Sequence, residues 1–196
     1  MSQTLRDRRA LVTGGSRGIG AAIVRRLARE GAHVALTYVS RPDRADETAK
    51  AAQAFGVRAL AIRADSADAG PVVAAVERAA AELGGLDILV NNAERMPFPG
   101  GAVYAMSKAA LVGLVKGLAR DLGRRGITIN NVQPGPIDTD MNPADSEVAR
   151  MLRDQILALP RYGTVDEIAA MVAYLAGPEA GFVTGASLTI DGGFTA

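Results

Sequence analysis

Two side chains in the middle of the chain have a spacing that could support proton transfer. They are the ends of the sequence Tyr104-Ala105-Met106-Ser107-Lys108. Four residues make about one helical turn, so the phenol and the ammonium share one face of a helix. A neighbouring cation favours the phenolate, which lets a tyrosine act as a general acid or base near neutral pH. Read alone, the pair also fits a tyrosine packed on a surface helix beside a solvated lysine.

A glycine-rich segment near the N-terminus could hold phosphate. Residues 13–20 read Thr-Gly-Gly-Ser-Arg-Gly-Ile-Gly, between an apolar stretch and a helix-forming stretch. Glycine allows a tight turn and a close approach of phosphate oxygens to the main chain. The following helix N-terminus offers free N–H groups and partial positive charge. The strand and helix around the segment favour nucleotide binding over a purely structural turn.

The elements that position these segments are predicted as strands alternating with helices. Strands are expected over residues 10–12, 33–39, 58–62, 86–90, 127–132 and 187–190. Helices are expected over residues 19–30, 44–55, 70–83, 103–122, 148–157 and 165–175. This alternation predicts an α/β fold with a doubly wound, mainly parallel sheet of the Rossmann type, in a single domain over 1–196. Ligands of such sheets bind at the carboxyl ends of the strands, where the glycine-rich turn begins.

Composition excludes several classes of function. The chain has 196 residues, 22 basic against 21 acidic, so we expect no nucleic-acid partner. It has no cysteine and one histidine, His33, which excludes thiolate or multi-histidine metal sites, and we expect no metal. No apolar run approaches the length of a membrane span, and no signal peptide is recognised, so we expect no membrane and a cytoplasmic location.

Taken together, the motifs resemble the short-chain dehydrogenase/reductase family. Residues 13–20 resemble its TGxxxGxG turn, and Tyr104 with Lys108 resembles its YxxxK pair. Four further segments resemble its remaining motifs: Asp65-Ser66, Asn91-Asn92-Ala93, Pro134-Gly135 with Thr139, and Asp191-Gly192-Gly193. The order of all these motifs matches, over nearly the whole chain. Within the family the pattern is similar to bacterial 3-oxoacyl-carrier-protein reductases.

The resemblance implies a role for each matching residue. Tyr104 would donate a proton to a carbonyl while hydride arrives from a nicotinamide, and Lys108 would bind the nicotinamide ribose and polarise Tyr104. The remaining cofactor contacts implied are Gly14, Gly18, Ile19 and Gly20 at the pyrophosphate, Asp65 and Ser66 at the adenine, Asn91 and Ala93 near the adenosine ribose, and Ile137 and Thr139 at the carboxamide. Ser16, Pro134 and Gly135 are further cofactor contacts within the same motifs. The substrate would be a small carbonyl or alcohol, with a 3-ketoacyl compound or a small ketone as the first expectation.

Charge predicts NADP(H) over NAD(H). An acidic residue at the end of the second strand would bind a ribose 2′-OH and repel a 2′-phosphate, but this region has no carboxylate before Asp43. Arg17 and Arg41 could each pair with a phosphate through two hydrogen bonds. The alternative is that either arginine is simply solvated.

The resemblance breaks between Ala93 and Tyr104, which are separated by only ten residues. The family places a helix and a central strand there, about 50 residues in all, ending with its catalytic serine. We therefore expect an internal deletion near Ala93-Glu94. A parallel strand needs a crossover of about a dozen residues, so the strand over 127–132 must move beside the fourth strand or leave a gap.

Three hypotheses follow for this chain. It is an oxidoreductase with an internal deletion, a nucleotide-binding module without catalysis, or a rearranged and inactive fragment. Because the missing helix commonly contributes to the family's oligomer interface, we expect at most a homodimer. The loop over 140–145 is either a mobile lid over the substrate or an ordinary surface connection.

Overall fold

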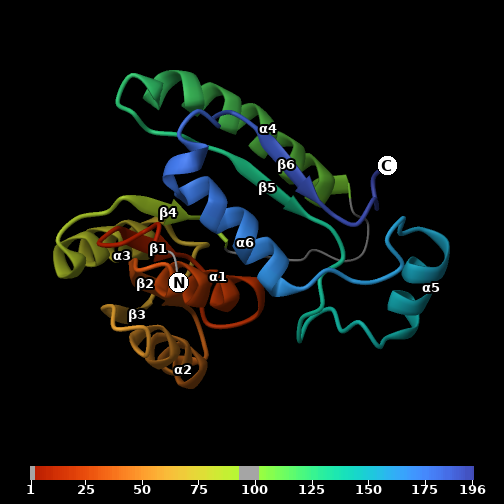
Figure 1. The fold of residues 1–196 in the computed structure, drawn as a ribbon, viewed down its shortest axis with the longest axis horizontal. Coiled ribbons are helices and arrows are strands. Elements are labelled where there is room, and N and C mark those ends of the chain that lie inside the picture. The colour runs from red at the N-terminus through yellow and green to blue at the C-terminus, as the bar shows by residue number, and fades with distance from the viewer. Residues whose placement is uncertain (1–2, 93–101) are drawn as a thin grey trace. The chain divides into compact units, whose positions relative to one another are not determined.

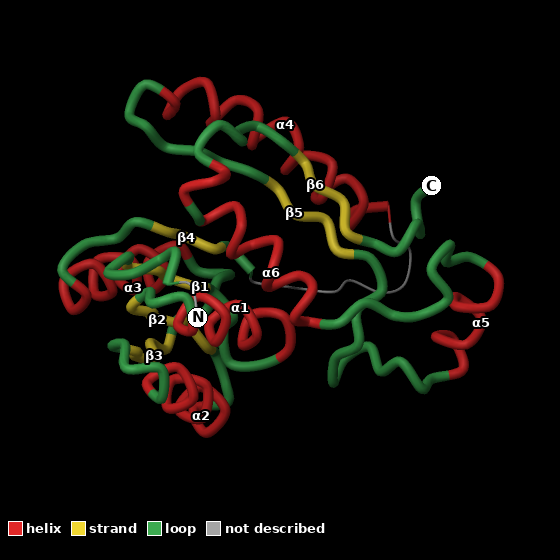
Figure 2. The backbone as a smooth tube through the Cα atoms, viewed as in Figure 1, coloured by secondary structure: helices red, strands yellow, loops and turns green. Residues whose placement is uncertain are grey.

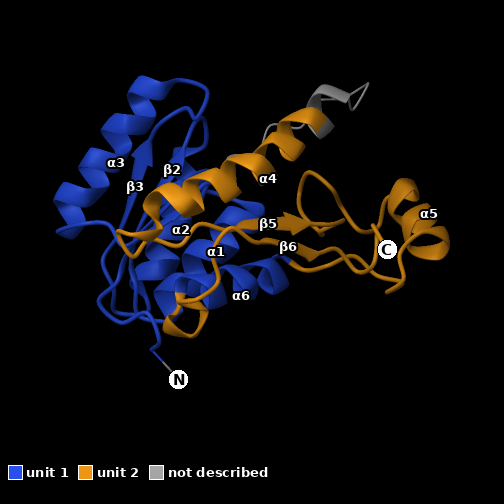
Figure 3. Ribbon diagram, turned by 90° about the horizontal axis from the view of Figure 1, so that it is seen from above, with its two compact units in different colours: residues 1–94, 165–176 blue, residues 95–164, 177–196 orange. Residues whose placement is uncertain are grey.

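The computed structural model describes residues 3–92 and 102–196, with the backbone alone for 102–105. The chain forms two compact units, shown in different colours in Figure 3. The first unit consists of Met1–Glu94 with Val165–Ala176, and the second of Arg95–Thr164 with Gly177–Ala196. In the described ranges, no helix is long and apolar enough to cross a membrane.

The first unit is a parallel sheet with helices on both faces (Figure 1). Its strand order is β3-β2-β1-β4, so β4 is an edge strand. The strands are β1 (Arg9–Val12), β2 (His33–Tyr38), β3 (Ala59–Arg63) and β4 (Ile88–Val90). The helices are α1 (Gly18–Arg29), α2 (Pro42–Gln53), α3 (Ala69–Leu83) and α6 (Val165–Ala176).

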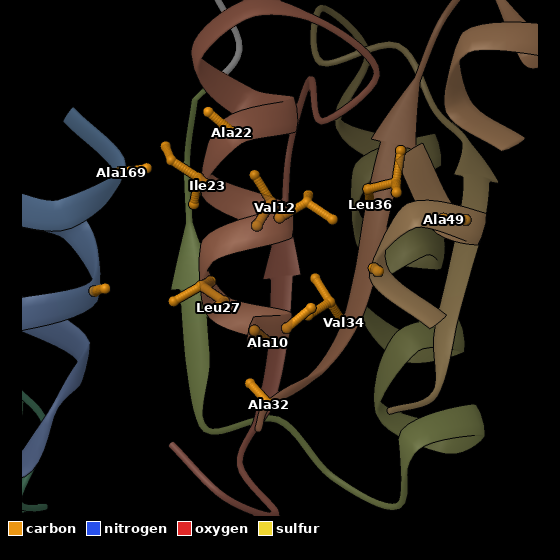
Figure 4. Packing of buried hydrophobic residues seen from close by; sticks show 14 of the residues in the cluster. Ala10, Val12, Ala22, Ile23, Leu27, Ala32, Val34, Leu36, Ala49 and Ala169 are labelled. Atoms are coloured by element: carbon orange, nitrogen blue, oxygen red, sulfur yellow. The ribbon is translucent and has the colours of Figure 1, made fainter. Parts of the chain in front are cut away.

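Neighbouring side chains of β1 enter different apolar clusters, because strand side chains alternate between the two faces of a sheet. Val12 belongs to a cluster that includes Leu27 of α1 and Ala169 of α6 (Figure 4). Leu11 belongs to the cluster on the other face, which includes Leu83 of α3. Each of these large side chains, once buried, contributes about 1.5–3 kcal/mol of transfer free energy. The core of the first unit therefore lies on both sides of β1 and β2.

On one face of β4 the apolar cover is incomplete, although Ile88 and Val90 pack against the cluster on the other face. Leu89 of β4 is the register partner of Leu11 and lies on the same face. Leu11 is 0% exposed, whereas Leu89 is 57% exposed. A leucine in a strand of a doubly wound sheet is expected to be covered by a helix. The exposure of Leu89 is consistent with the absence of the helix and strand that the family comparison predicts after residue 93.

The second unit contains a two-stranded parallel sheet and the remaining helices (Figure 2). Its elements are α4 (Ala102–Gly123), β5 (Asn131–Pro134), α5 (Glu147–Gln155), the 3-10 helix η1 (Pro178–Ala180) and β6 (Ser187–Ile190). β5 pairs with β6, and Pro134 lies opposite Ile190. The pairing places the ends of both strands, and the segments that follow them, at one edge of this small sheet.

β5 begins at Asn131, four residues later than the predicted start at 127. Just before it, one backbone bond remains, from Gly185 N to the Ile129 carbonyl at 2.7 Å, and the other bonds involve side chains. Asn130 Nδ2 donates to the Val183 carbonyl at 2.7 Å, and Ala186 N donates to Asn130 Oδ1 at 3.2 Å. The asparagine amide thus takes the backbone groups that a regular ladder would use.

The predicted Rossmann-like α/β fold with parallel strands is confirmed. Every predicted helix and strand is present, with ends moved by up to four residues. Helix α2 begins at Pro42 rather than at 44, and η1 was not predicted. In the described ranges the strands form two separately hydrogen-bonded sheets, and β5 pairs with β6 rather than with β4, as the second of the two expected alternatives requires.

Candidate functional site

The glycine-rich turn leaves β1 and is held against the end of β2. Gly14 N donates to Thr37 Oγ1 at 3.1 Å, and Gly15 N donates to the Thr37 carbonyl at 3.0 Å. Thr37 is buried within an otherwise apolar strand. Its hydroxyl therefore fixes the first glycines of the turn. Thr37 is not among the predicted site residues, although a polar residue inside an apolar strand is a signal that could have indicated it.

Asn92 ties the end of β4 to the same turn. Its Nδ2 donates to the carbonyls of Thr13 and Gly14, at 3.2 and 3.3 Å. Its backbone N donates to Thr13 Oγ1 at 2.9 Å, and Thr13 Oγ1 also lies 3.2 Å from Asn91 Oδ1. The sequence predicted Asn91 and Ala93 as contacts near the ribose. Asn92, between them, was not predicted and instead supports the turn.

The turn needs glycine for both conformation and space. Gly14 and Gly18 have φ of 62° and 51°, in the left-handed region. A Cβ atom on Gly20 would lie 2.5 Å from Asn92 Nδ2 and would collide with the Gly14 carbonyl. The main chain of the turn is thus packed closely against the start of α1.

The backbone N–H groups at the N-terminus of α1 could bind an anion. Its N-cap is Arg17, in extended backbone with φ of −157°, and no side chain caps the helix there. The first turn of α1 has no acidic residue. Free N–H groups and the helix dipole favour a negatively charged group at this end. The arrangement fits a diphosphate between the turn and α1, with Ser16, Ile19 and the exposed Arg17 side chain beside it.

Arg41 follows β2 and is bound by a carboxylate of its own unit. Its Nε donates to Asp43 Oδ1 at 3.1 Å, and its Nη2 donates to Asp43 Oδ2 at 2.7 Å. The hydrogen bond from Arg41 lowers the pKa of Asp43 to about 2. The sequence predicted Arg41 as a phosphate contact without foreseeing this partner.

The other predicted residues of the first unit follow β3 and β4. Asp65 Oδ1 accepts from Ala67 N at 2.9 Å and so shapes the turn after β3, with Ser66 exposed beside it. Because β1 to β4 are parallel, their carboxyl ends share one edge of the sheet. Gly14, Arg41, Asp65 and Asn91 all follow that edge. Ala93 lies outside the described residues.

The predicted proton-transfer pair lies on α4. The helix spans Ala102–Gly123, so Tyr104 and Lys108 are four residues apart on one helix, as expected. The Tyr104 side chain lies outside the described part of the structure. Lys108 is exposed. The distance between the two side chains is not tested, and the pair stays a prediction.

The motifs after β5 are packed against the C-terminal segment. Gly135 N donates to the Ile190 carbonyl at 3.1 Å, and a Cβ atom on Gly135 would lie 2.5 Å from the Asp191 Cα atom. The Pro134-Gly135 motif and the Asp191-Gly192-Gly193 motif are therefore in direct contact. Ile137 is buried and pairs with Gly163 through an isolated bridge.

Thr139 lines an open hollow of about 760 Å³ in the second unit. The hollow is lined by Asp138, Thr139, Asp140, Pro143, Ala144, Asp145, Arg150 and Arg153. Its loop is held internally, since Ala144 N donates to Asp138 Oδ1 at 3.0 Å and Asn142 Nδ2 donates to the Ile137 carbonyl at 3.2 Å. Among the residues described, no cluster could hold a metal ion.

Comparison with known proteins identifies the family. A family profile described as short chain dehydrogenase matches residues 8–95, and one described as enoyl-(acyl carrier protein) reductase matches residues 93–195. The chain belongs to the short-chain dehydrogenase/reductase family. The resemblance that the motifs predicted is therefore confirmed.

Two curated members of this family are similar over almost their whole length. An Escherichia coli protein described as a cyclic-di-GMP-binding biofilm dispersal mediator is 43% identical over 238 positions, covering 95% of this chain and 96% of its own. A Staphylococcus aureus 3-oxoacyl-(acyl-carrier-protein) reductase is 34% identical, covering 94% of this chain and 96% of its own.

Solved structures of short-chain dehydrogenases/reductases are similar to this fold over nearly their whole length. One from Serratia marcescens is 50% identical, with a TM-score of 0.92, and covers 98% of this chain and 99% of its own. One from Burkholderia cenocepacia, in complex with NADP, is 44% identical, with a TM-score of 0.93 and the same coverage. These matches place the chain in a family with members that bind NADP.

Proposed function

We propose that the protein is an NADP(H)-dependent oxidoreductase that interconverts a small carbonyl compound and an alcohol. The observation that carries the proposal is the glycine turn, braced by Thr37 and Asn92, that leads into the uncapped N-terminus of α1. In a member of the short-chain dehydrogenase/reductase family, this cradle suits a dinucleotide diphosphate. The NADP complex of the Burkholderia relative supports the choice of cofactor.

The cofactor contacts follow from the matching motifs. Gly14, Ser16, Gly18, Ile19 and Gly20 hold the diphosphate. The remaining contacts are Asp65 and Ser66 at the adenine, Asn91 and Ala93 at its ribose, Arg17 and Arg41 at a 2′-phosphate, and Pro134, Gly135, Ile137 and Thr139 at the carboxamide. These positions follow strand ends or lie in the glycine turn, which is the expected ligand side of a doubly wound sheet.

When bound, the nicotinamide would supply a hydride for the carbonyl carbon. Tyr104 gives its phenolic proton to the carbonyl oxygen, and Lys108, one turn further along α4, binds the nicotinamide ribose and favours the phenolate. The reductase from Staphylococcus aureus supports a 3-oxoacyl compound as the first substrate to test. A simple ketone is the second.

A fluorescence titration of the purified chain with NADPH and with NADH tests the cofactor. Saturable binding with preference for NADPH is expected. Arg17→Ala should weaken NADPH binding about tenfold and NADH binding far less, because only NADPH carries the 2′-phosphate. Arg25→Ala removes the same charge from an exposed position of the same helix and is the matched control. Equal losses for both nucleotides in Arg17→Ala would contradict the preference.

A second candidate function is nucleotide binding without catalysis. The observation in its favour is the edge position of β4 and the exposure of Leu89, which are consistent with loss of the strand that carries the family's serine. The Escherichia coli relative, described as a cyclic-di-GMP-binding mediator, supports the same reading. Cyclic di-GMP should then compete with NADPH in the titration.

Turnover separates the two candidates. An oxidoreductase consumes NADPH in the presence of the 3-oxoacyl compound, and Tyr104→Phe abolishes turnover while NADPH still binds. A binding module has the same affinity for NADPH in the unmodified chain and in Tyr104→Phe, and neither protein consumes NADPH. Loss of binding in Tyr104→Phe would contradict the assignment of this residue to proton transfer alone.

Two comparisons support an internal deletion near Ala93-Glu94. The two family profiles meet at residues 93–95. The match to the Escherichia coli protein runs over 238 positions, at least 42 more than the 196 residues of the chain. We propose that the missing segment is the helix and central strand of the family. The predicted cytoplasmic location and an assembly no larger than a homodimer stay predictions.

A further inference from the structure

The first carboxylate after β2 is engaged with the arginine that precedes it. Asp43 accepts two hydrogen bonds from Arg41, at 3.1 and 2.7 Å. Both side chains remain accessible, with 59% of Arg41 and 55% of Asp43 exposed. The pair therefore lies where a ligand can reach it.

The contact uses one of the two edges through which an arginine can grip an anion. Nε and Nη2 both point to Asp43, and this edge commonly forms two parallel hydrogen bonds with a carboxylate or phosphate. The hydrogen bond to Asp43 is the main cause that raises the pKa of the Arg41 guanidinium, and the charge of Glu47 adds the smallest contribution. Asp43 is therefore the carboxylate that engages this positive charge.

Arg17 is in a different electrostatic setting. It is exposed at the N-cap of α1, whose first turn has no acidic residue. The ion pairs found in the described ranges do not include Arg17. The two arginines predicted at the 2′-phosphate therefore do not have the same capacity to bind it.

We infer that Asp43 is a specificity-determining residue that weakens the preference for NADPH over NADH by occupying Arg41. A 2′-phosphate must displace the carboxylate or share the guanidinium with it, and in either case two negative groups approach each other. NADH has no such group and meets no such repulsion. Arg17 is then the main contact to the phosphate. This inference rests on the proposed binding of nicotinamide dinucleotides.

The test compares Asp43→Asn with Asp46→Asn, which removes a carboxylate from the same helix without changing the Arg41 pair. Dissociation constants for NADPH and NADH are measured by fluorescence titration, and melting curves check that each variant is folded. Asp43→Asn should raise the ratio of NADPH to NADH affinity about two- to fivefold, as expected for an exposed ion pair. Asp46→Asn should leave the ratio unchanged.

The double variant shows whether the effect passes through Arg41. Adding Asp43→Asn to Arg41→Ala should leave the affinity ratio where Arg41→Ala alone puts it. A ratio that falls in Asp43→Asn would mean that Asp43 positions Arg41 for the phosphate, and a ratio that stays constant would mean that the pair has no influence. Either result, with saturable binding, overturns this inference alone. Absence of saturable binding of both nucleotides to the unmodified chain overturns the proposed function as well.

Discussion

Gly20 illustrates how closely the main chain packs at the nucleotide turn. A methyl group there would meet the Gly14 carbonyl and the Asn92 amide, both of which belong to the network that braces the turn. The same network uses the Thr37 hydroxyl and the Thr13 hydroxyl. Asn92, Thr37 and Thr13 can therefore affect nucleotide binding through the conformation of the turn, without contacting the nucleotide.

Gly20→Ala is expected to abolish saturable NADPH binding, because the added Cβ atom displaces Gly14 or Asn92. Gly117→Ala is the matched control, since Gly117 lies in α4 with open space around the added atom. Alanine in a helix is favoured over glycine by about 0.5–1 kcal/mol, so this variant should keep its binding and melt slightly higher. Titration and thermal melts measure both effects. Unchanged NADPH affinity in Gly20→Ala would contradict the geometry.

Tyr162 has a buried hydroxyl without a hydrogen-bond partner in the described structure. An unsatisfied buried polar group costs about 1–3 kcal/mol. Tyr162→Phe should therefore raise the free energy of unfolding by about 1 kcal/mol, measured by urea denaturation. Tyr174→Phe, at a residue that is 43% exposed, should change it by less than about 0.5 kcal/mol. A destabilised Tyr162→Phe would show that the hydroxyl has a partner in solution.

Between elements, one acidic residue joins the starts of β1 and β4. Asp87 accepts from Arg9 N at 2.9 Å, from Arg9 Nε at 2.7 Å and from Arg9 Nη2 at 2.9 Å. The side-chain hydrogen bond from Arg9 lowers the pKa of Asp87 and, in turn, raises that of Arg9. This pair holds the edge strand of the first unit at the end of the sheet opposite the nucleotide turn.

Stability should depend on the charge of Asp87. Because its pKa is lower in the folded chain than in the unfolded chain, where it is about 3.9, the contribution is fully present above about pH 5. It is lost as the pH falls through the folded value. Asp87→Asn should lower the Tm at pH 7, and the difference from the unmodified chain should shrink below about pH 4. The Tm of Asp46→Asn should follow the unmodified chain, and a difference for Asp87→Asn that is constant with pH would refute the assignment.

The helices and strands could be predicted from the sequence more accurately than the side-chain contacts between them. Apolar spacing predicts α1, which buries one face, and a short apolar run predicts β1, which is buried on both faces. The start of β5 was predicted four residues too early, because Asn130 makes side-chain bonds to backbone groups that a ladder would pair. The glycine turn was predicted from its spacing. The Arg41 to Asp43 pair was not, because the choice of partner depends on side-chain conformations that spacing does not contain. Thr37 and Asn92 were missed because their partners are backbone groups distant in sequence.

At the scale of the whole molecule, the described strands form two parallel sheets, and a family member is expected to have one. Leu89 lies on the face that Leu11 buries under α3, yet it remains more than half exposed. Both observations are consistent with the proposed loss of the family's central strand and its helix.

Inserting the corresponding segment of about 50 residues from a related reductase at Ala93-Glu94 should raise both the Tm and the rate of turnover, because it supplies a strand beside β4 and the serine. A glycine- and serine-rich insert of equal length is the control and should do neither. Turnover with the 3-oxoacyl compound, melting curves and binding of an apolar dye measure the outcome. No gain from inserts of several family members would argue against the deletion.

The helix α6 completes the first unit from a distant part of the chain. It packs on α1 and contributes Ala169 and Ala173 to the same cluster as Leu27. A ribosome adds about 5–20 residues per second, so residues 95–164 delay α6 by several seconds after β4 has been made. During that time the apolar face of α1 is without its final cover. The apolar face of α1 is therefore accessible to chaperones while the chain is being made. This interval ends only when residue 176 has left the ribosomal tunnel.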